Sequence, residues 1–161
     1  MAAVTKAALR RELQAKLAEM LATAREAHAA AVEGATHGES RAENDKDTRG
    51  LEQSYLARGQ AARVAELETA ALLVARLPIE PWPPDAPIAV GALVTVSEGD
   101  ATTRYLMAAG GGGVRLDGGK VHVVTPTSPI GGALAGKRVS DETTLRGPGG
   151  APRELTIEQV E

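Results

Sequence analysis

Four carboxylates fall within nine residues in the first third of the chain: Glu39, Glu43, Asp45 and Asp47. We name residues 37–47, which hold them, the acidic tip. Carboxylate oxygens are the ligands that Mg²⁺ prefers, and they also attract basic protein surfaces. A charged cluster beside a helix end is also a common solvated cap, so the residues alone leave both interpretations open.

The segments on either side of the acidic tip have the apolar spacing of paired helices. Over residues 6–34 the apolar positions step by 4, 3, 4, 3 and 4: Leu13, Leu17, Met20, Ala24, Ala27 and Ala31. This spacing predicts a coiled-coil seam. Gly34 and Gly38 are expected to end this helix, because glycine just past a helix end is the usual stop.

A second helix is predicted from about residue 47 to residue 77. Its seam steps by 3, 4 and 3 through Val64, Leu67, Ala71 and Val74. Asn44, Asp45 or Asp47 is the expected N-terminal cap. Leu51 and Tyr55 fall outside this heptad frame, so the pairing should be irregular near the acidic tip. Two antiparallel helices of this length give an arm of roughly 45 Å with the acids at its end.

A cluster of prolines predicts the boundary between two domains. Five of them fall in residues 78–87, where Trp82 is expected to fill the junction. The predicted organisation is therefore a helical hairpin over residues 1–77, a stiff linker over 78–87 and a β-rich domain over 88–161. The fold class is α+β.

The β-rich domain shows short alternating apolar runs separated by glycine turns. Strands are expected around residues 90–96, 105–107, 114–116, 121–124, 139–145 and 154–160. The run Asp117-Gly118-Gly119 predicts a hairpin turn. The four glycines at 110–113 are interpreted as a hairpin tip and not as a phosphate loop, since no Lys-Ser/Thr helix follows them. Ser128 is the expected cap of a short helix over 131–135, with Pro129 at its first position.

The composition argues against several classes of function. The only aromatic residues are Tyr55, Trp82 and Tyr105, so an aromatic-lined substrate pocket is hard to build. The net charge is −3, with no basic face, which disfavours independent binding of duplex nucleic acid. There is no cysteine, and the three histidines (His28, His37 and His122) are too scattered for a metal site. We see no signal peptide or membrane span, and we expect a cytoplasmic protein with no membrane partner.

The C-terminal part resembles a known family. Residues 125–137 read Thr-Pro-Thr-Ser-Pro-Ile-Gly-Gly-Ala-Leu-Ala-Gly-Lys. This run is similar to the C-terminal signature of the bacterial Gre family of transcript cleavage factors, as is the later Gly147-Pro148-Gly149-Gly150. The resemblance implies a coiled-coil hairpin followed by an FKBP-like β-rich domain. It implies an accessory factor, not an enzyme: the β-rich domain docks on RNA polymerase, and the hairpin enters the secondary channel to stimulate cleavage of backtracked RNA.

The same resemblance implies roles for individual residues. Glu39 follows His37-Gly38 and Glu43 precedes Asn44, so these two carboxylates are the expected catalytic pair. They would act on the Mg²⁺ of the polymerase and only in complex with it, with no cofactor bound by the protein alone. Asp45 and Asp47 are secondary candidates. The expected docking residues are Ser128, Pro129, Ile130 and Gly131. We expect a monomer that meets nucleic acid only inside the elongation complex.

Three departures from the family pattern keep an alternative open. Glu39 and Glu43 are four residues apart, where the family's pair is three apart. Asp45 and Asp47 are additional acids, and residues 47–51 differ from typical cleavage factors. Some family members with altered, acid-rich tips inhibit transcription. The second hypothesis is therefore a channel-binding regulator that does not support cleavage. Two further hypotheses are a prolyl isomerase and a plain coiled-coil adaptor. The sequence offers too few aromatic residues to form the walls of a prolyl isomerase site.

Overall fold

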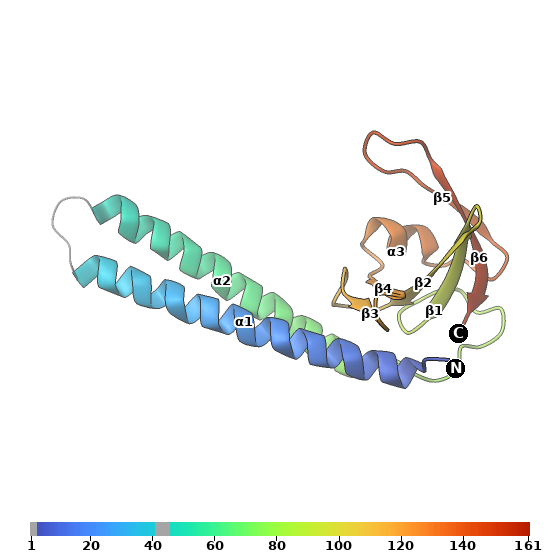
Figure 1. The fold of residues 1–161 in the computed structure, drawn as a ribbon, viewed down its shortest axis with the longest axis horizontal. Coiled ribbons are helices and arrows are strands. Elements are labelled where there is room, and N and C mark those ends of the chain that lie inside the picture. The colour runs from blue at the N-terminus through green and yellow to red at the C-terminus, as the bar shows by residue number, and fades with distance from the viewer. Residues whose placement is uncertain (1–2, 41–45) are drawn as a thin grey trace. The chain divides into compact units, whose positions relative to one another are not determined.

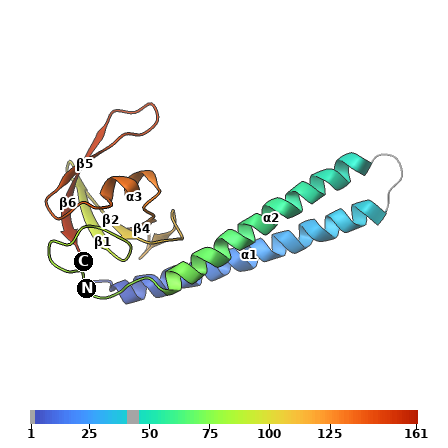
Figure 2. The same cartoon turned by 180° about the vertical axis from the view of Figure 1, so that it is seen from behind.

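Two long helices make up the N-terminal half of the computed structural model, which describes residues 3–40 and 46–161. Helix α1 spans Lys6–Ser40 and helix α2 spans Lys46–Ala75. They run antiparallel and side by side in both views (Figures 1 and 2). The predicted hairpin is confirmed, and its apolar seam is the reason for it. Leu13, Leu17, Ala24, Ala31, Leu67 and Val74 are all buried.

The predicted end of the first helix is wrong, because α1 continues through Gly34 and Gly38 to Ser40. A Cβ placed on Gly34 would lie 2.9 Å from Oε1 of Gln53 in α2. Glycine at this position therefore allows close approach of the facing helix and does not act as a stop. Glycine inside a helix costs about 1 kcal/mol relative to alanine.

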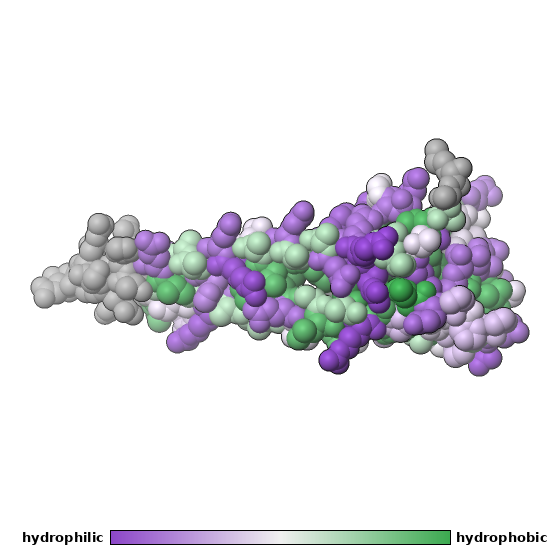
Figure 3. Space-filling model, turned by 90° about the horizontal axis from the view of Figure 1, so that it is seen from below, coloured by the Kyte–Doolittle hydropathy of each residue, from purple (hydrophilic) through white to green (hydrophobic). Residues whose placement is uncertain are grey.

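The irregular part of the seam lies where the sequence breaks its heptad frame. Leu51 and Tyr55 are 55% and 60% exposed, whereas Gln53 between them contacts Gly34. Further along the helices, Arg25 and Glu68 form an ion pair at 3.2 Å across the hairpin. Figure 3 shows hydrophobic residues interspersed with hydrophilic ones over the exposed face of the helices.

The C-terminal half is a six-stranded mixed sheet with one short helix. Its strands are β1 (Leu93–Glu98), β2 (Ala101–Met107), β3 (Arg115–Leu116), β4 (Val121–Val124), β5 (Glu142–Leu145) and β6 (Arg153–Val160). Helix α3 spans Pro129–Leu134. The strand order is β3-β4-β2-β1-β6-β5. Only the β2–β4 pair is parallel among the described strands. The α+β class is confirmed.

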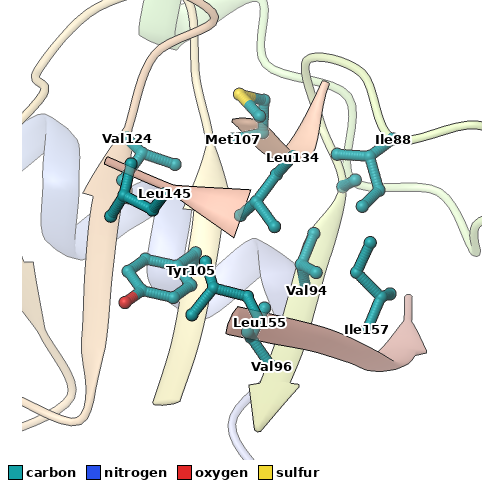
Figure 4. Close-up of a cluster of buried hydrophobic side chains, with 11 residues drawn as sticks. Ile88, Val94, Val96, Tyr105, Met107, Val124, Leu134, Leu145, Leu155 and Ile157 are labelled. Carbon is teal, nitrogen blue, oxygen red and sulfur yellow. The ribbon is translucent and has the colours of Figure 1, made fainter. Parts of the chain in front are cut away.

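One face of this sheet forms a core with α3. Val94, Val96, Tyr105, Met107, Leu155 and Ile157 project from the strands toward Leu134 of α3, as Figure 4 shows. The alternate residues of the strands, among them Leu93, Leu106 and Val123, are also buried. The sheet is therefore buried on both faces over short stretches of β1, β2 and β4, where apolar residues follow one another: Leu93-Val94, Tyr105-Leu106-Met107 and Val123-Val124.

Two local predictions in this domain are wrong. The glycines at 110–113 do not form a hairpin tip between β2 and β3, because β2 pairs with β4 in parallel and the loop is a crossover. Gly111 has φ +77°, and a Cβ there would lie 3.0 Å from Cδ1 of Leu13. The loop thus passes closely against α1. Val139 lies outside any strand and is 41% exposed.

The described chain divides into two compact units, and one of them is built from two separate stretches of the sequence. The sheet unit comprises Met1–Ala15 and Ala71–Glu161, and the arm unit comprises Lys16–Ala70. The first turns of α1 and the last turn of α2 therefore pack with the sheet. Among the described helices, none is long and apolar enough to cross a membrane.

Candidate functional site

The acidic tip lies largely beyond the part of the chain whose side chains are described. Glu43 and Asp45 are outside the described residues. Glu39 is the next-to-last residue of α1 and Asp47 the second residue of α2, and the structure describes only their helical backbone. The roles of these four acids therefore stay predictions. Among the described residues, no three His, Asp or Glu side chains gather where they could hold a metal ion.

The predicted docking run begins with a tightly bonded turn. The Ser128 hydroxyl accepts from the backbone N–H of Thr125 at 3.3 Å and of Gly131 at 3.1 Å. It also donates to the carbonyl of Thr125 at 2.8 Å. Ser128 is the N-cap of α3 and Pro129 is its first residue, as the sequence predicted. The hydroxyl is thus committed to the fold.

Gly131 is held at its position by a backbone contact. It is buried, and a Cβ on it would lie 1.7 Å from the carbonyl oxygen of Thr125. Any side chain there would displace the turn. Ile130 is partly buried against the core, whereas Pro129 is exposed. Pro129 and the exposed Pro126 and Thr127 before it are the parts of this segment that a partner can touch. The docking role of the run Ser128–Gly131 stays a prediction.

A buried charge near the start of α1 escaped the sequence reasoning. Lys6 is only 9% exposed, and its Nζ donates to the carbonyls of Glu80 at 2.5 Å and Gly91 at 3.2 Å. Burial lowers the pKa of Lys6 below its usual value, and the nearby carboxylates of Glu80 and Glu161 only partly offset this. In the sequence, Lys6, Leu9 and Leu13 are spaced by 3 and 4 residues. This spacing puts Lys6 in the apolar seam of the helix, which is the feature that indicates its burial.

Trp82 lies beside this lysine. Its ring centroid is 5.4 Å from Nζ of Lys6, within the range of a cation–π contact. Trp82 also packs against the core of the sheet. Tyr105 is 5% exposed within that core, with its ring 5.8 Å from that of His122. Tyr105 is therefore used in packing, which leaves it unavailable as a wall of a prolyl isomerase pocket.

Comparison with known proteins gives one family. Residues 84–161 match the family described as transcription elongation factor GreA/GreB, C-terminal domain. The match spans the last prolines of the linker and the whole sheet. No curated protein matches the chain.

Solved structures similar to this chain include GreA factor homologs and a GreA/GreB factor. GreA factor homolog 1 (Gfh1) of Thermus thermophilus is 21% identical over 92% of this chain and 94% of its own, with a TM-score of 0.40. Gfh1 of Thermus aquaticus is 19% identical over 90% and 91%, with a TM-score of 0.39. The elongation factor GreA/GreB of Nitrosomonas europaea is 18% identical over 58% and 78%, with a TM-score of 0.37.

Proposed function

Since the chain belongs, through its residues 84–161, to the GreA/GreB family of transcription elongation factors, we propose that it binds RNA polymerase and stimulates cleavage of backtracked RNA. The observation that carries this proposal is the family domain joined to a helical hairpin, with four carboxylates in the sequence where the first helix gives way to the second. Family members are accessory transcription factors, so the cleavage chemistry would belong to the polymerase.

The carboxylates of the acidic tip have the chemistry of additional ligands for Mg²⁺. Mg²⁺ takes hard oxygen ligands and keeps several waters, so one or two added carboxylates are enough. When held by the polymerase, the ion would lower the pKa of the attacking water and stabilise the leaving oxygen. Glu39 and Glu43 would add negative oxygen ligands and orient the attacking water. They are too few to form a site alone, which supports action only within the complex.

The docking end of the molecule would be the sheet domain. The turn before α3 is rigid because Ser128 makes three hydrogen bonds within it. A rigid turn loses little conformational freedom on binding, which favours it as a recognition surface. The exposed Pro129 is the residue of this run best placed to contact the polymerase.

The deciding experiment uses purified elongation complexes stalled in a backtracked position. RNA cleavage is measured with and without the full chain, together with binding of the chain to the polymerase. Faster cleavage supports the proposal. Binding that slows elongation without cleavage would replace it with the inhibitory regulator, which the four-residue spacing of Glu39 and Glu43 favours. An absence of binding would leave the adaptor interpretation.

A further inference from the structure

A cavity of about 480 Å³ lies within the sheet unit, between the start of α1, the proline-rich linker and the strands β1 and β6. Its volume is in the range of small-molecule sites. The wall is mainly apolar and includes Ile79, Pro81, Trp82, Leu93 and Val160. Lys6 and Glu161 add charged groups to it. Its lining shares no residue with the acidic tip or with the turn before α3.

Lys6 gives this cavity a cationic group with unused hydrogen-bonding capacity. It is the only buried charged residue among those described. An ammonium group has three N–H donors, and two of them go to the carbonyls of Glu80 and Gly91. The third has no acceptor among the described residues; the face of Trp82 is its remaining neighbour.

Trp82 contributes a second unpaired donor to the same wall. Its indole N–H is buried and has no hydrogen-bond partner in the described structure. A buried donor without a partner is costly. The unused donor of Lys6 in this mainly apolar wall favours a ligand that carries an acceptor.

The two acceptors that Nζ of Lys6 already uses are neutral carbonyl oxygens. Glu80 and Glu161 are the carboxylates that act on Lys6, and Glu161 is already paired with Arg104 at 3.4 Å. Desolvation outweighs their attraction, so the pKa of Lys6 is lowered. Among the described contacts neither carboxylate accepts a hydrogen bond from Nζ of Lys6, so its third donor is left for an anionic acceptor.

We propose that this cavity binds a small amphipathic carboxylate. Its anionic group would accept from Nζ of Lys6, beside the ring of Trp82. Its apolar body would lie against Ile79, Pro81, Leu93 and Val160. Such a ligand would join α1, the linker and the sheet, and it would raise the thermal stability of the sheet unit by binding the folded state. This inference does not depend on the proposed action on RNA polymerase.

The chain carries its own reporter for the test, because Trp82 is its only tryptophan. The full chain is titrated with sodium octanoate while Trp82 fluorescence and the melting temperature are followed. Octanol and octylammonium chloride are controls with the same number of carbon atoms. The expected result is a saturable change with octanoate and affinity at least about tenfold weaker for both controls, as expected for a charged hydrogen bond. No saturable binding, or equal binding of octanoate and octanol, would overturn the proposal.

A matched pair of variants tests the role of Lys6 in binding. Lys6→Met keeps the apolar stem and removes the charge, and it should weaken octanoate binding by about tenfold or more. Lys120→Met, at an exposed position, should bind as the wild type does. Should Lys6→Met fail to fold, the wild type is titrated at rising alkaline pH instead. Octanoate affinity must then fall as Lys6 loses its proton, while octanol affinity stays constant; unchanged octanoate affinity would refute the assignment.

Discussion

The carboxylate of Glu12 accepts a bifurcated hydrogen bond from the backbone N–H of Asp117, 105 residues further along the chain, with N–O distances of 3.0 and 3.2 Å. Asp117 begins the turn between β3 and β4, where φ is +52° at Asp117, +64° at Gly118 and +90° at Gly119. Next to Glu12, Leu13 is fully buried and lies against Gly111. The first turns of α1 are thus attached to two loops of the sheet domain by one polar and one apolar contact.

Removing the acceptor at position 12 should destabilise the protein. We expect Glu12→Ala to lower the free energy of unfolding by about 1–2 kcal/mol, because it leaves a partly buried N–H unpaired. Glu12→Gln retains a carbonyl acceptor and should lose less. Urea unfolding followed by Trp82 fluorescence measures both. Equal stability of the Ala variant and the wild type would mean that the contact contributes nothing in solution.

Two neighbouring glycines of α3 should respond very differently to a methyl group. Gly131→Ala would bring its Cβ to 1.7 Å from the carbonyl oxygen of Thr125, so the turn capped by Ser128 must open. We expect a loss of about 3 kcal/mol, the upper end for overpacking. Gly132→Ala meets the carbonyl oxygen of Pro126 at 3.3 Å and should change stability little. Thermal unfolding of the two variants distinguishes them; similar melting temperatures would contradict the packing described for Gly131.

Negative charge at the acidic tip should matter more than its shape. Replacing Glu39 and Glu43 by Gln preserves size while removing two Mg²⁺-competent anions. Cleavage of backtracked RNA should fall by about tenfold or more, the scale of lost metal ligation. Binding to the polymerase should be unchanged, because the proposed docking residues lie in the sheet domain. Both are measured on the same purified elongation complexes.

The matched control for this experiment is the second pair of acids. Asp45→Asn with Asp47→Asn should have the smaller effect if these acids mainly stabilise the start of α2, whose second residue is Asp47. The opposite ranking would assign the functional pair to Asp45 and Asp47. Identical behaviour of every variant in every polymerase assay would favour the hypothesis that the protein is a plain coiled-coil adaptor.

Lys6 should give the stability of the protein a pH dependence of defined sign. Because burial lowers the pKa of Lys6 below 10.5, the unfolded chain binds more protons than the folded one between these two pKa values. Stability should therefore rise relative to Lys6→Met as the pH increases through this window toward 10.5. At lower pH the desolvation penalty is fully present. Urea unfolding at a series of alkaline pH values measures the difference, and a flat or falling difference would disprove the assignment.

Local signals in the sequence predicted the elements of this fold well. The spacing of Leu13, Leu17 and Ala24 predicted a buried helical seam, and Ser128-Pro129 predicted the start of α3. Such features depend on neighbours within a few residues, which the sequence displays directly. The four acids of the tip were equally visible, but their function depends on a partner.

Contacts between distant segments could not be predicted in the same way. The parallel β2–β4 pair and the contact of Gly111 with Leu13 depend on the three-dimensional path of the chain. Gly34 was misjudged for a similar reason, since its role is set by Gln53 in the facing helix. Lys6 escaped notice because lysine is normally solvated, and only its carbonyl partners at Glu80 and Gly91 make its burial acceptable.

The position of β1 between β2 and β6 has a consequence for synthesis on the ribosome. β2 follows β1 at once, but Ser97 of β1 meets Glu158 of β6 only 61 residues later. Until β6 emerges, one side of β1 presents unpaired backbone N–H and C=O groups, which are a template for pairing with another nascent chain. Translation speed over residues 101–153 should therefore set how long this edge stays open, and with it the fraction of chains lost to aggregation.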